Sequence, residues 1–277
     1  MMETGDVAAS RLFCRDAAFR FSEKGENFMT TIFWAGDSTV KQNSIVTFPQ
    51  TGIGQAFTRY IDRERVRVEN HAENGRSTRS FIDEGRMAPI YDRITAGDFL
   101  FVQFGHNDEK SNDPGRYTDP DTAFQENLGK FVNVARNKGA TPVFITPVTR
   151  YHLGDASEEY RHVRWAAAVK EAGARLGVEV IDLTSLSEEL VQRTGEAART
   201  TFYMNLPAGV YPHFPGGQKD NTHLQPAGAL AFAALIAREL HKLGGAYAAL
   251  LCPDFAQYMA EADGFSTTDN AAQEVEL

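Results

Sequence analysis

The sequence of 277 residues predicts an α/β protein, a three-layer α/β/α sandwich around a five-stranded parallel sheet. Two patterns lead to this prediction. Five short β-rich runs alternate with helical stretches along the chain, which is the order typical of parallel sheets. In addition, Phe-Leu-Phe-Val-Gln-Phe at 99–104 and Val-Phe-Ile-Thr at 143–146 are continuous rather than alternating, as expected for strands covered on both faces.

The expected elements follow one another with clear boundaries. The strands are Thr31–Ala35, Val66–Asn70, Asp98–Phe104, Pro142–Pro147 and Val178–Leu183, each ending in a polar or glycine-bearing loop. The helices are Ile53–Asp62, Thr78–Ile94, Ala123–Lys138, Ser157–Leu176, Ser185–Thr194 and Ala227–Leu243. Gly139 and Gly177 stand where helix C-caps are expected, and Pro226 stands at the first turn of the last helix, where proline is favoured.

No linker divides the chain, so we expect one domain over residues 29–261. Residues 1–28 form an N-terminal arm of uncertain structure, in which 18–21 alternate as a strand would. Residues 262–277 form a polar, acidic C-terminal tail.

Composition excludes several classes of function. A net charge of −9 argues against a nucleic-acid partner, which needs clustered Lys and Arg. The chain has no run of 18 apolar residues, so no membrane-spanning helix is expected. Residues 1–28 lack the apolar stretch of a secretory signal, and we therefore expect a cytoplasmic protein. Cys14 and Cys252 are too few for a disulfide framework, although a single bridge between them stays open. No H-E-x-x-H or similar ligand set occurs, and we expect no metal or cofactor.

Ser38 is the candidate nucleophile. It lies in Gly36-Asp37-Ser38-Thr39, directly after the first expected strand, so its hydroxyl emerges at the carboxyl end of the sheet. The alternative is a plain turn with a helix cap, because Asp, Ser and Thr are favoured caps.

His223 is the candidate base. Of the seven histidines, two have a carboxylate three residues before them. Glu159 and His162 lie in a charged helical stretch, where a solvated pair is the simpler interpretation. Asp220 and His223 lie in a loop before the last helix, where Asp220 could fix the imidazole tautomer while His223 takes a proton from Ser38.

Two further segments could stabilise an oxyanion. Asn107 follows the third expected strand, and its amide can donate a hydrogen bond to a tetrahedral intermediate. Gly75 follows the second expected strand, and its backbone N–H is not blocked by a side chain. The alternatives are a loop cap for Asn107, local packing for His106 and a simple turn at Gly75.

Together these segments resemble the SGNH (GDSL-type) hydrolase superfamily, and within it the rhamnogalacturonan acetylesterase-like enzymes. The resemblance rests on A-G-D-S-T-V at 35–40, N-x-A-x-x-G-R-S-x-R-S-F at 70–81, Q-F-G-H-N-D at 103–108 and D-N-T-H-L-Q-P-A-G-A at 220–229. It implies the flavodoxin-like fold of that superfamily, with Ser38 as nucleophile, His223 as base and then acid, and Asp220 as its orienting carboxylate. It also implies an oxyanion hole made by the Ser38 and Gly75 N–H groups and the Asn107 side chain.

The implied reaction is two-step hydrolysis of an O-acetylated oligosaccharide, pectic fragments first and acetylated xylan or another hemicellulose second. A lipid esterase or thioesterase on the same fold and a non-catalytic carbohydrate-binding protein remain alternatives, and the sequence does not indicate an oligomeric state. The expected substrate contacts are Arg76, Arg79, His106 and Tyr211. Lys110, Arg116 and Arg150 could add positive charge for a uronic acid, unless they are ordinary surface charges.

Overall fold

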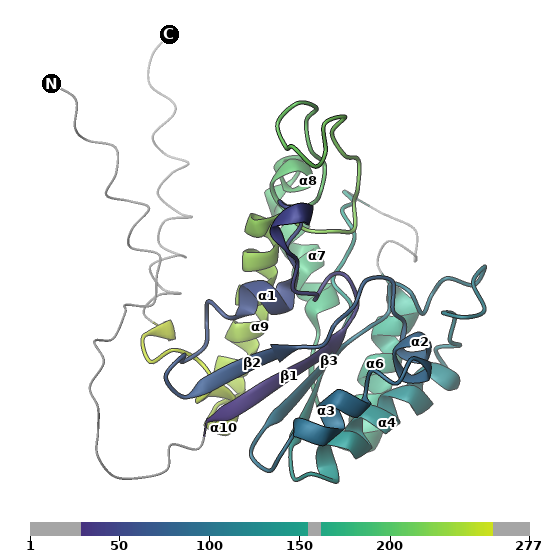
Figure 1. The fold of residues 1–277 in the computed structure, drawn as a ribbon, viewed down its shortest axis with the longest axis vertical. Coiled ribbons are helices and arrows are strands. Elements are labelled where there is room, and N and C mark those ends of the chain that lie inside the picture. The colour runs from purple at the N-terminus through teal and green to yellow at the C-terminus, as the bar shows by residue number, and fades with distance from the viewer. Residues whose placement is uncertain (1–28, 155–161, 257–277) are drawn as a thin grey trace, which may run out of the picture.

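The computed structural model describes residues 29–154 and 162–256, and these form a parallel sheet covered by helices on both faces (Figure 1). The strands are β1 (Thr30–Gly36), β2 (Val66–Asn70), β3 (Phe99–Gln103), β4 (Thr141–Ile145) and β5 (Glu179–Ile181). They are all parallel, in the order β2-β1-β3-β4-β5. The predicted three-layer fold class is confirmed.

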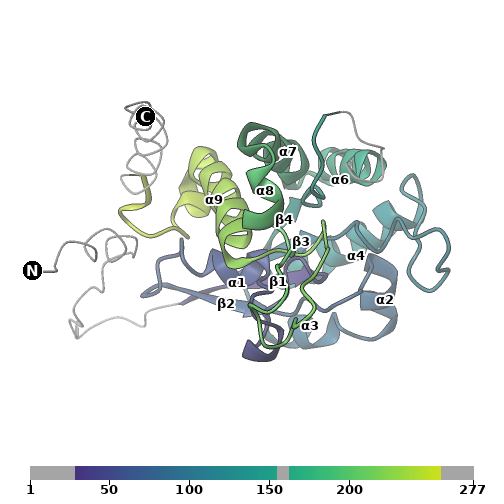
Figure 2. The ribbon, with the colours of Figure 1, turned by 90° about the horizontal axis from the view of Figure 1, so that it is seen from above.

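The helices divide between the two faces of the sheet (Figures 1 and 2). One face carries α1 (Ile53–Phe57), α7 (Leu183–Thr194), α8 (Ala197–Thr201), α9 (Pro226–Leu243) and α10 (Gly245–Ala248). The other face carries α2 (Thr78–Asp83), α3 (Ala88–Arg93), α4 (Ala123–Arg136) and α6 (Val163–Leu176). A 3₁₀ turn, η2 (Ile45–Thr47), lies between β1 and α1.

The first strand shows why the expected strands have no polar face. Ile32 and Trp34 pack into the core beneath α1 and α9, whereas Phe33 and Ala35 pack into the core beneath α2 and α4. All four are at most 1% exposed, so both faces of β1 are shielded from water. Polar side chains on either face would therefore be buried without hydrogen-bond partners.

Several expected boundaries were wrong, for local reasons. The expected helix Thr78–Ile94 is two helices, α2 and α3, because the chain turns between them at Gly85 with φ +70°. The last expected strand ends at Ile181 instead of Leu183, since the Asp182 side chain caps α7 and Leu183 already begins that helix. The first expected helix is shorter and ends at Phe57.

Part of the expected organisation lies outside the described residues: the arm 1–28 with Cys14, positions 155–161, and the tail. Cys252 is buried. Within residues 29–154 and 162–256 no helix is long and apolar enough to cross a membrane.

Candidate active site

Ser38 lies at the carboxyl end of the sheet in a tight turn after β1. The Asp37 carbonyl accepts hydrogen bonds from the N–H groups of Val40 and Lys41, and the Asp37 carboxylate accepts from the Thr39 N–H at 2.9 Å and the Thr39 hydroxyl at 2.8 Å. Ser38 is thereby held at a fixed point with 8% of its surface exposed.

A close approach of the chain explains Gly36 before this turn. A Cβ atom built there would lie 2.9 Å from the Gln103 carbonyl oxygen and 2.9 Å from a Val40 methyl carbon. Gly36 and Gln103 are partners in the pairing of β1 with β3, so the segments that follow these two strands begin side by side. Any larger residue at 36 would push them apart.

His223 joins Ser38 to Asp220 across 185 positions of sequence. Its Nε2 atom lies 2.9 Å from Ser38 Oγ, and its Nδ1 atom lies 2.7 Å from Asp220 Oδ2. The other carboxylate oxygen of Asp220 accepts from the backbone N–H groups of Thr222 at 2.8 Å and His223 at 3.0 Å. The structure therefore brings together the three residues that the sequence singled out as a Ser-His-Asp set.

The protonation state of Asp220 determines which tautomer His223 adopts. Burial acts to raise the pKa of Asp220, but hydrogen bonds from His223 and from the two backbone N–H groups outweigh it and lower the pKa to about 2. An ionised carboxylate only accepts hydrogen bonds, so the His223 proton is on Nδ1. The Nε2 lone pair then faces the Ser38 hydroxyl.

The loop that carries His223 is tied to neighbouring loops. The His223 carbonyl accepts from the Met204 N–H at 2.9 Å, and the Asn221 carbonyl accepts from the Tyr151 N–H at 2.8 Å. The Asn205 side-chain amide donates to the Asp220 carbonyl at 3.0 Å. These contacts hold the loop at the sheet edge through segments that follow α8 and β4.

Asn107 follows β3 and is 4% exposed. Its Nδ2 donates to the Arg76 carbonyl at 3.2 Å, and its Oδ1 accepts from Arg116 at 3.4 Å. This donor and this acceptor fix the orientation of the amide, and the second N–H of Nδ2 is left to donate elsewhere.

Asp108 fixes the Gly75 loop against the Asn107 loop. Its buried carboxylate accepts from the Thr78 N–H at 2.9 Å and from the hydroxyls of Thr78 and Thr118 at 2.6 and 2.7 Å. The bond to Thr78 satisfies the first turn of α2, immediately after the loop that contains Gly75. Gly75 has φ +73°, a left-handed conformation that glycine adopts without strain.

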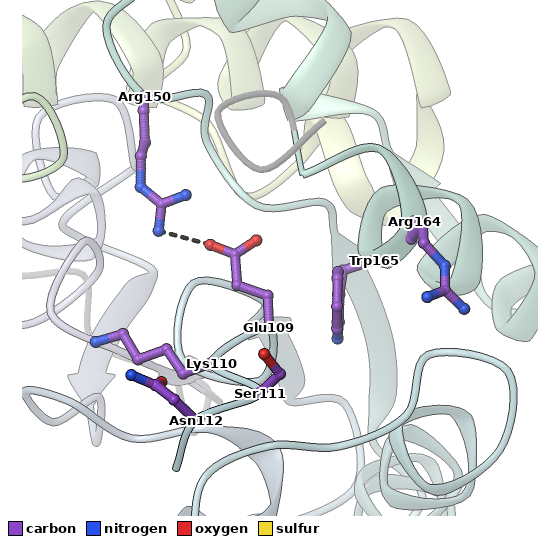
Figure 3. Close-up of a pocket in the computed structure, with 7 residues that line it drawn as sticks. All are labelled: Glu109, Lys110, Ser111, Asn112, Arg150, Arg164 and Trp165. Carbon is purple, nitrogen blue, oxygen red and sulfur yellow. Dashed lines mark ion pairs between the residues drawn. The ribbon is translucent and has the colours of Figure 1, made fainter. Parts of the chain in front are cut away.

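A series of buried polar side chains next to the site could not be recognised from the sequence. The Glu109 side chain is 5% exposed, and one of its carboxylate oxygens lies 2.8 Å from His162 Nδ1. The other oxygen lies 2.6 Å from an Arg150 nitrogen (Figure 3). Arg150 Nε also donates to the Thr222 hydroxyl at 3.2 Å, next to His223. Glu109 thus links the loop after β3 to the loop that bears the candidate base.

His162 corrects the expectation of a solvated pair with Glu159. It is fully buried at the start of α6, with φ 52°, and its ring centroid lies 4.2 Å from that of His106. Burial and the neighbouring His106 lower the pKa of His162 to about 4, so at neutral pH it is uncharged and donates Nδ1–H to Glu109. Because these partners are 53 positions apart, no local spacing in the sequence signals their contact.

The expected substrate contacts lie in three surroundings. Arg76 pairs with Glu84 at 2.9 Å, and Arg79 donates to the Pro114 carbonyl at 3.3 Å. His106 is 4% exposed, with Nδ1 3.5 Å from Asp37 Oδ2. Tyr211 lies in the loop after α8, with its ring centroid 6.0 Å from that of Phe48. His106 is therefore held next to the residue that precedes Ser38, whereas Arg76 and Arg79 have partners outside the Ser-His-Asp set.

Within the part of the chain that the structure describes, no three His, Cys, Asp or Glu side chains come together as metal ligands would. The chemistry that this arrangement can perform is proton transfer from a serine hydroxyl to an imidazole oriented by a carboxylate.

The chain is similar to several known proteins. Residues 35–231 match the GDSL-like Lipase/Acylhydrolase family. The chain is 38% identical to the rhamnogalacturonan acetylesterase RhgT of Bacillus subtilis over 214 residues, which is 77% of this chain and 90% of that protein. It is 37% identical over 213 residues to the probable rhamnogalacturonan acetylesterase YesY of the same organism, covering 77% of this chain and 93% of the relative. The crystal structure of the YxiM protein of Bacillus subtilis superposes with a TM-score of 0.66 at 26% identity, over 78% of this chain and 57% of that one.

Proposed function

This chain belongs to the GDSL-like lipase/acylhydrolase family and is a carboxylic ester hydrolase, and we propose that it removes O-acetyl groups from carbohydrate through Ser38, His223 and Asp220. The observation on which the proposal rests is the unbroken contact from Asp220 Oδ2 through His223 to Ser38 Oγ, at 2.7 and 2.9 Å. These three residues lie at the carboxyl edge of a parallel sheet, where open α/β folds bind ligands.

The proposed reaction has two steps. Ser38 Oγ attacks the acetyl carbonyl while His223 Nε2 takes its proton, and the imidazolium is stabilised by Asp220. The tetrahedral intermediate collapses, the sugar hydroxyl leaves with the proton from His223, and the acetyl group remains on Ser38. Water, deprotonated by His223, then attacks this ester, and acetate is released as Ser38 Oγ leaves with the proton from His223.

The oxyanion of each tetrahedral intermediate needs donors that are in place before the reaction. We assign the Ser38 and Gly75 backbone N–H groups and the second N–H of Asn107 to this task. Support comes from the fixed amide of Asn107 and from Asp108, which holds the Asn107 and Gly75 loops together. Such donors reduce the barrier without reorganisation at the moment of reaction.

The proposed substrate is a rhamnogalacturonan-type pectic oligosaccharide. The support is the identity of 38% and 37% to two relatives that bear that name, each covered over nine-tenths of its length. We propose that Arg76, Arg79 and Tyr211 contact the sugar chain, and that His106 acts by supporting Asp37 beneath Ser38.

The test is acetate release from acetylated pectic fragments, acetylated xylo-oligosaccharides and short acyl lipids, with Ser38→Ala as the blank. We expect the highest kcat/KM on the pectic fragments and no release by the variant. Faster release from xylan or lipid would reject the substrate and keep the chemistry. Release that survives in Ser38→Ala would reject the nucleophile.

A further inference from the structure

The loop that bears the candidate base is held by the segment that follows β4. The Tyr151 N–H donates to the Asn221 carbonyl at 2.8 Å, and Arg150 Nε donates to the Thr222 hydroxyl at 3.2 Å. The first of these bonds comes from the backbone and the second from a side chain. A change of the Arg150 side chain therefore leaves the backbone bond in place and removes the other.

Thr222 connects Arg150 to the candidate base and its carboxylate. It stands between Asp220 and His223 in the sequence, and its N–H donates to Asp220 Oδ1 at 2.8 Å. Its hydroxyl accepts from Arg150, so Thr222 is held on one side by the carboxylate and on the other by the guanidinium. A displacement of Thr222 would disturb the contact of 2.7 Å between Asp220 Oδ2 and His223 Nδ1.

The Arg150 guanidinium is itself held by Glu109. Arg150 Nη2 lies 2.6 Å from Glu109 Oε1, and the two side chains are 13% and 5% exposed (Figure 3). Arg150 thus uses two different nitrogens, Nη2 toward Glu109 and Nε toward Thr222. A guanidinium presents such donors in a rigid planar fork, whereas a lysine ammonium is a single point charge. Arg150→Lys would keep the positive charge and lose the second nitrogen.

Glu109 is fixed on its other side by His162. The Oε2 atom of Glu109 lies 2.8 Å from His162 Nδ1, and His162 is fully buried. Burial acts to raise the pKa of Glu109, but the hydrogen bond from His162 and the charge of Arg150 outweigh it and lower the pKa. Glu109 is therefore ionised at neutral pH, and both of its oxygens are engaged by buried or half-buried partners.

Arg150 also lines a cavity of about 440 Å³, so direct contact with a substrate is the competing role for this side chain. The printed contacts favour a positioning role, because the two nitrogens described above are directed to protein groups. The two roles differ in their kinetics. A substrate contact acts on KM, whereas a group that aligns the base acts on kcat.

We propose that Arg150 is a positioning residue, which fixes Asp220 and His223 relative to Ser38 through Thr222 and is held in the required orientation by Glu109. The assignment rests on the proposed function. It adds to the Ser-His-Asp set a second layer of residues that touch neither the substrate nor the reacting atoms. Their effect is to keep the imidazole within reach of the serine hydroxyl in every turnover.

The variants are chosen to separate the hydroxyl of Thr222 from its shape. Thr222→Val removes the hydroxyl and keeps the branched side chain, and Thr222→Ser keeps the hydroxyl. Arg150→Lys and the double variant of Arg150→Lys with Thr222→Val complete the set. The matched controls are Thr58→Val and Arg136→Lys, because Thr58 and Arg136 donate to backbone carbonyls on other elements at 2.9 Å each.

Two reactions at Ser38 are measured for each protein. One is steady-state acetate release from an acetylated oligosaccharide and from a small soluble acetyl ester. The other is inactivation by a small alkyl fluorophosphonate, in which Ser38 Oγ bonds to phosphorus, fluoride leaves and the serine proton passes to His223. This reagent carries no sugar, so its rate reports the alignment of Ser38 and His223 without carbohydrate binding. Urea unfolding shows that each variant is folded.

We expect Thr222→Val and Arg150→Lys each to lower kcat about 10- to 100-fold, because small displacements of a reacting group have effects of this size. The KM values should stay within about twofold of the wild type, and inactivation by the fluorophosphonate should slow in proportion to kcat. The double variant should lose no more than about twofold beyond Thr222→Val, since both changes break the same contact. Thr222→Ser and the two control variants should keep wild-type rates.

A folded Thr222→Val protein with wild-type kcat and a wild-type inactivation rate would overturn the assignment. Losses that multiply in the double variant would also overturn it, because Arg150 would then act on a group other than Thr222. A raised KM in Arg150→Lys with an unchanged inactivation rate would make Arg150 a substrate contact instead. If Arg150→Lys does not fold, the comparison of Thr222→Val with Thr222→Ser still decides.

The wild type separates this proposal from the proposed function. A wild type that releases acetate and reacts with the fluorophosphonate, with variants that match it, would overturn the positioning role and leave the esterase proposal standing. A folded wild type that neither releases acetate nor reacts at Ser38 would overturn both.

Discussion

Asp220→Asn separates the charge of Asp220 from its structural contacts. The amide oxygen of Asn can still accept from the Thr222 and His223 N–H groups, now accepted at 2.8 and 3.0 Å, so the loop keeps its shape. The NH₂ group replaces Oδ2, which lies 2.7 Å from His223 Nδ1, and an amide NH₂ cannot accept a hydrogen bond. The imidazole then places its proton on Nε2, facing Ser38, where it can no longer take the serine proton.

The expected cost follows from that tautomer. The equivalent substitution in a serine-protease triad lowers kcat about 10⁴-fold, which corresponds to about 5 kcal/mol of barrier. We expect a loss of this size in kcat for acetate release, with KM changed little. The assay is steady-state kinetics on a soluble acetyl ester, with urea unfolding to show that the variant is folded.

Asp92→Asn is the matched control, because Asp92 is exposed on α3. It should keep wild-type kinetics. If Asp220→Asn is folded and its kcat stays within tenfold of the wild type, Asp220 does not orient His223 and the reasoning is refuted.

Three further variants test the surroundings of Ser38. Asn107→Ala should lower kcat about 10²- to 10³-fold in the same assay, and wild-type kcat in that variant would remove Asn107 from the oxyanion hole. Gly75→Ala should lower the free energy of unfolding by about 1 to 2 kcal/mol, because φ at this position is +73° and a left-handed backbone strains alanine. A steric clash does not contribute, since the nearest side-chain atom to a new Cβ is 3.8 Å away. An unchanged urea midpoint would contradict that reading. Burial raises the pKa of Asp108 to about 7, so its protonated form adds stability that is complete below about pH 4 and is lost as pH rises through 7. Asp108→Asn, which cannot ionise, should flatten the dependence of the unfolding free energy on pH between these values. An unchanged slope would contradict the raised pKa of Asp108.

The parts of the fold that the sequence predicted are those with local signals. The continuous apolar runs marked strands with two buried faces, and Leu100 and Phe101 indeed pack into different cores. The break at Gly85 was missed, since a single glycine in a helical pattern is compatible with both a continuing and an ending helix.

The candidate site likewise has contacts with a local sequence signal and contacts without one. Asp220 and His223 are three residues apart, so their pairing could be enumerated from the sequence. Glu109 meets His162 and Arg150 across 53 and 41 positions, and such contacts depend on how the loops after β3 and β4 fold over the sheet.

The central claim is that the acyl group passes through Ser38. The most direct measurement is intact-mass and peptide mass spectrometry after rapid acid quench during turnover of an activated acetyl ester. A single added acetyl group on Ser38 in the wild type, absent from Ser38→Ala, is the predicted result. Acetate release without any acetylated Ser38 peptide, or the same acetylation in Ser38→Ala, would contradict the account.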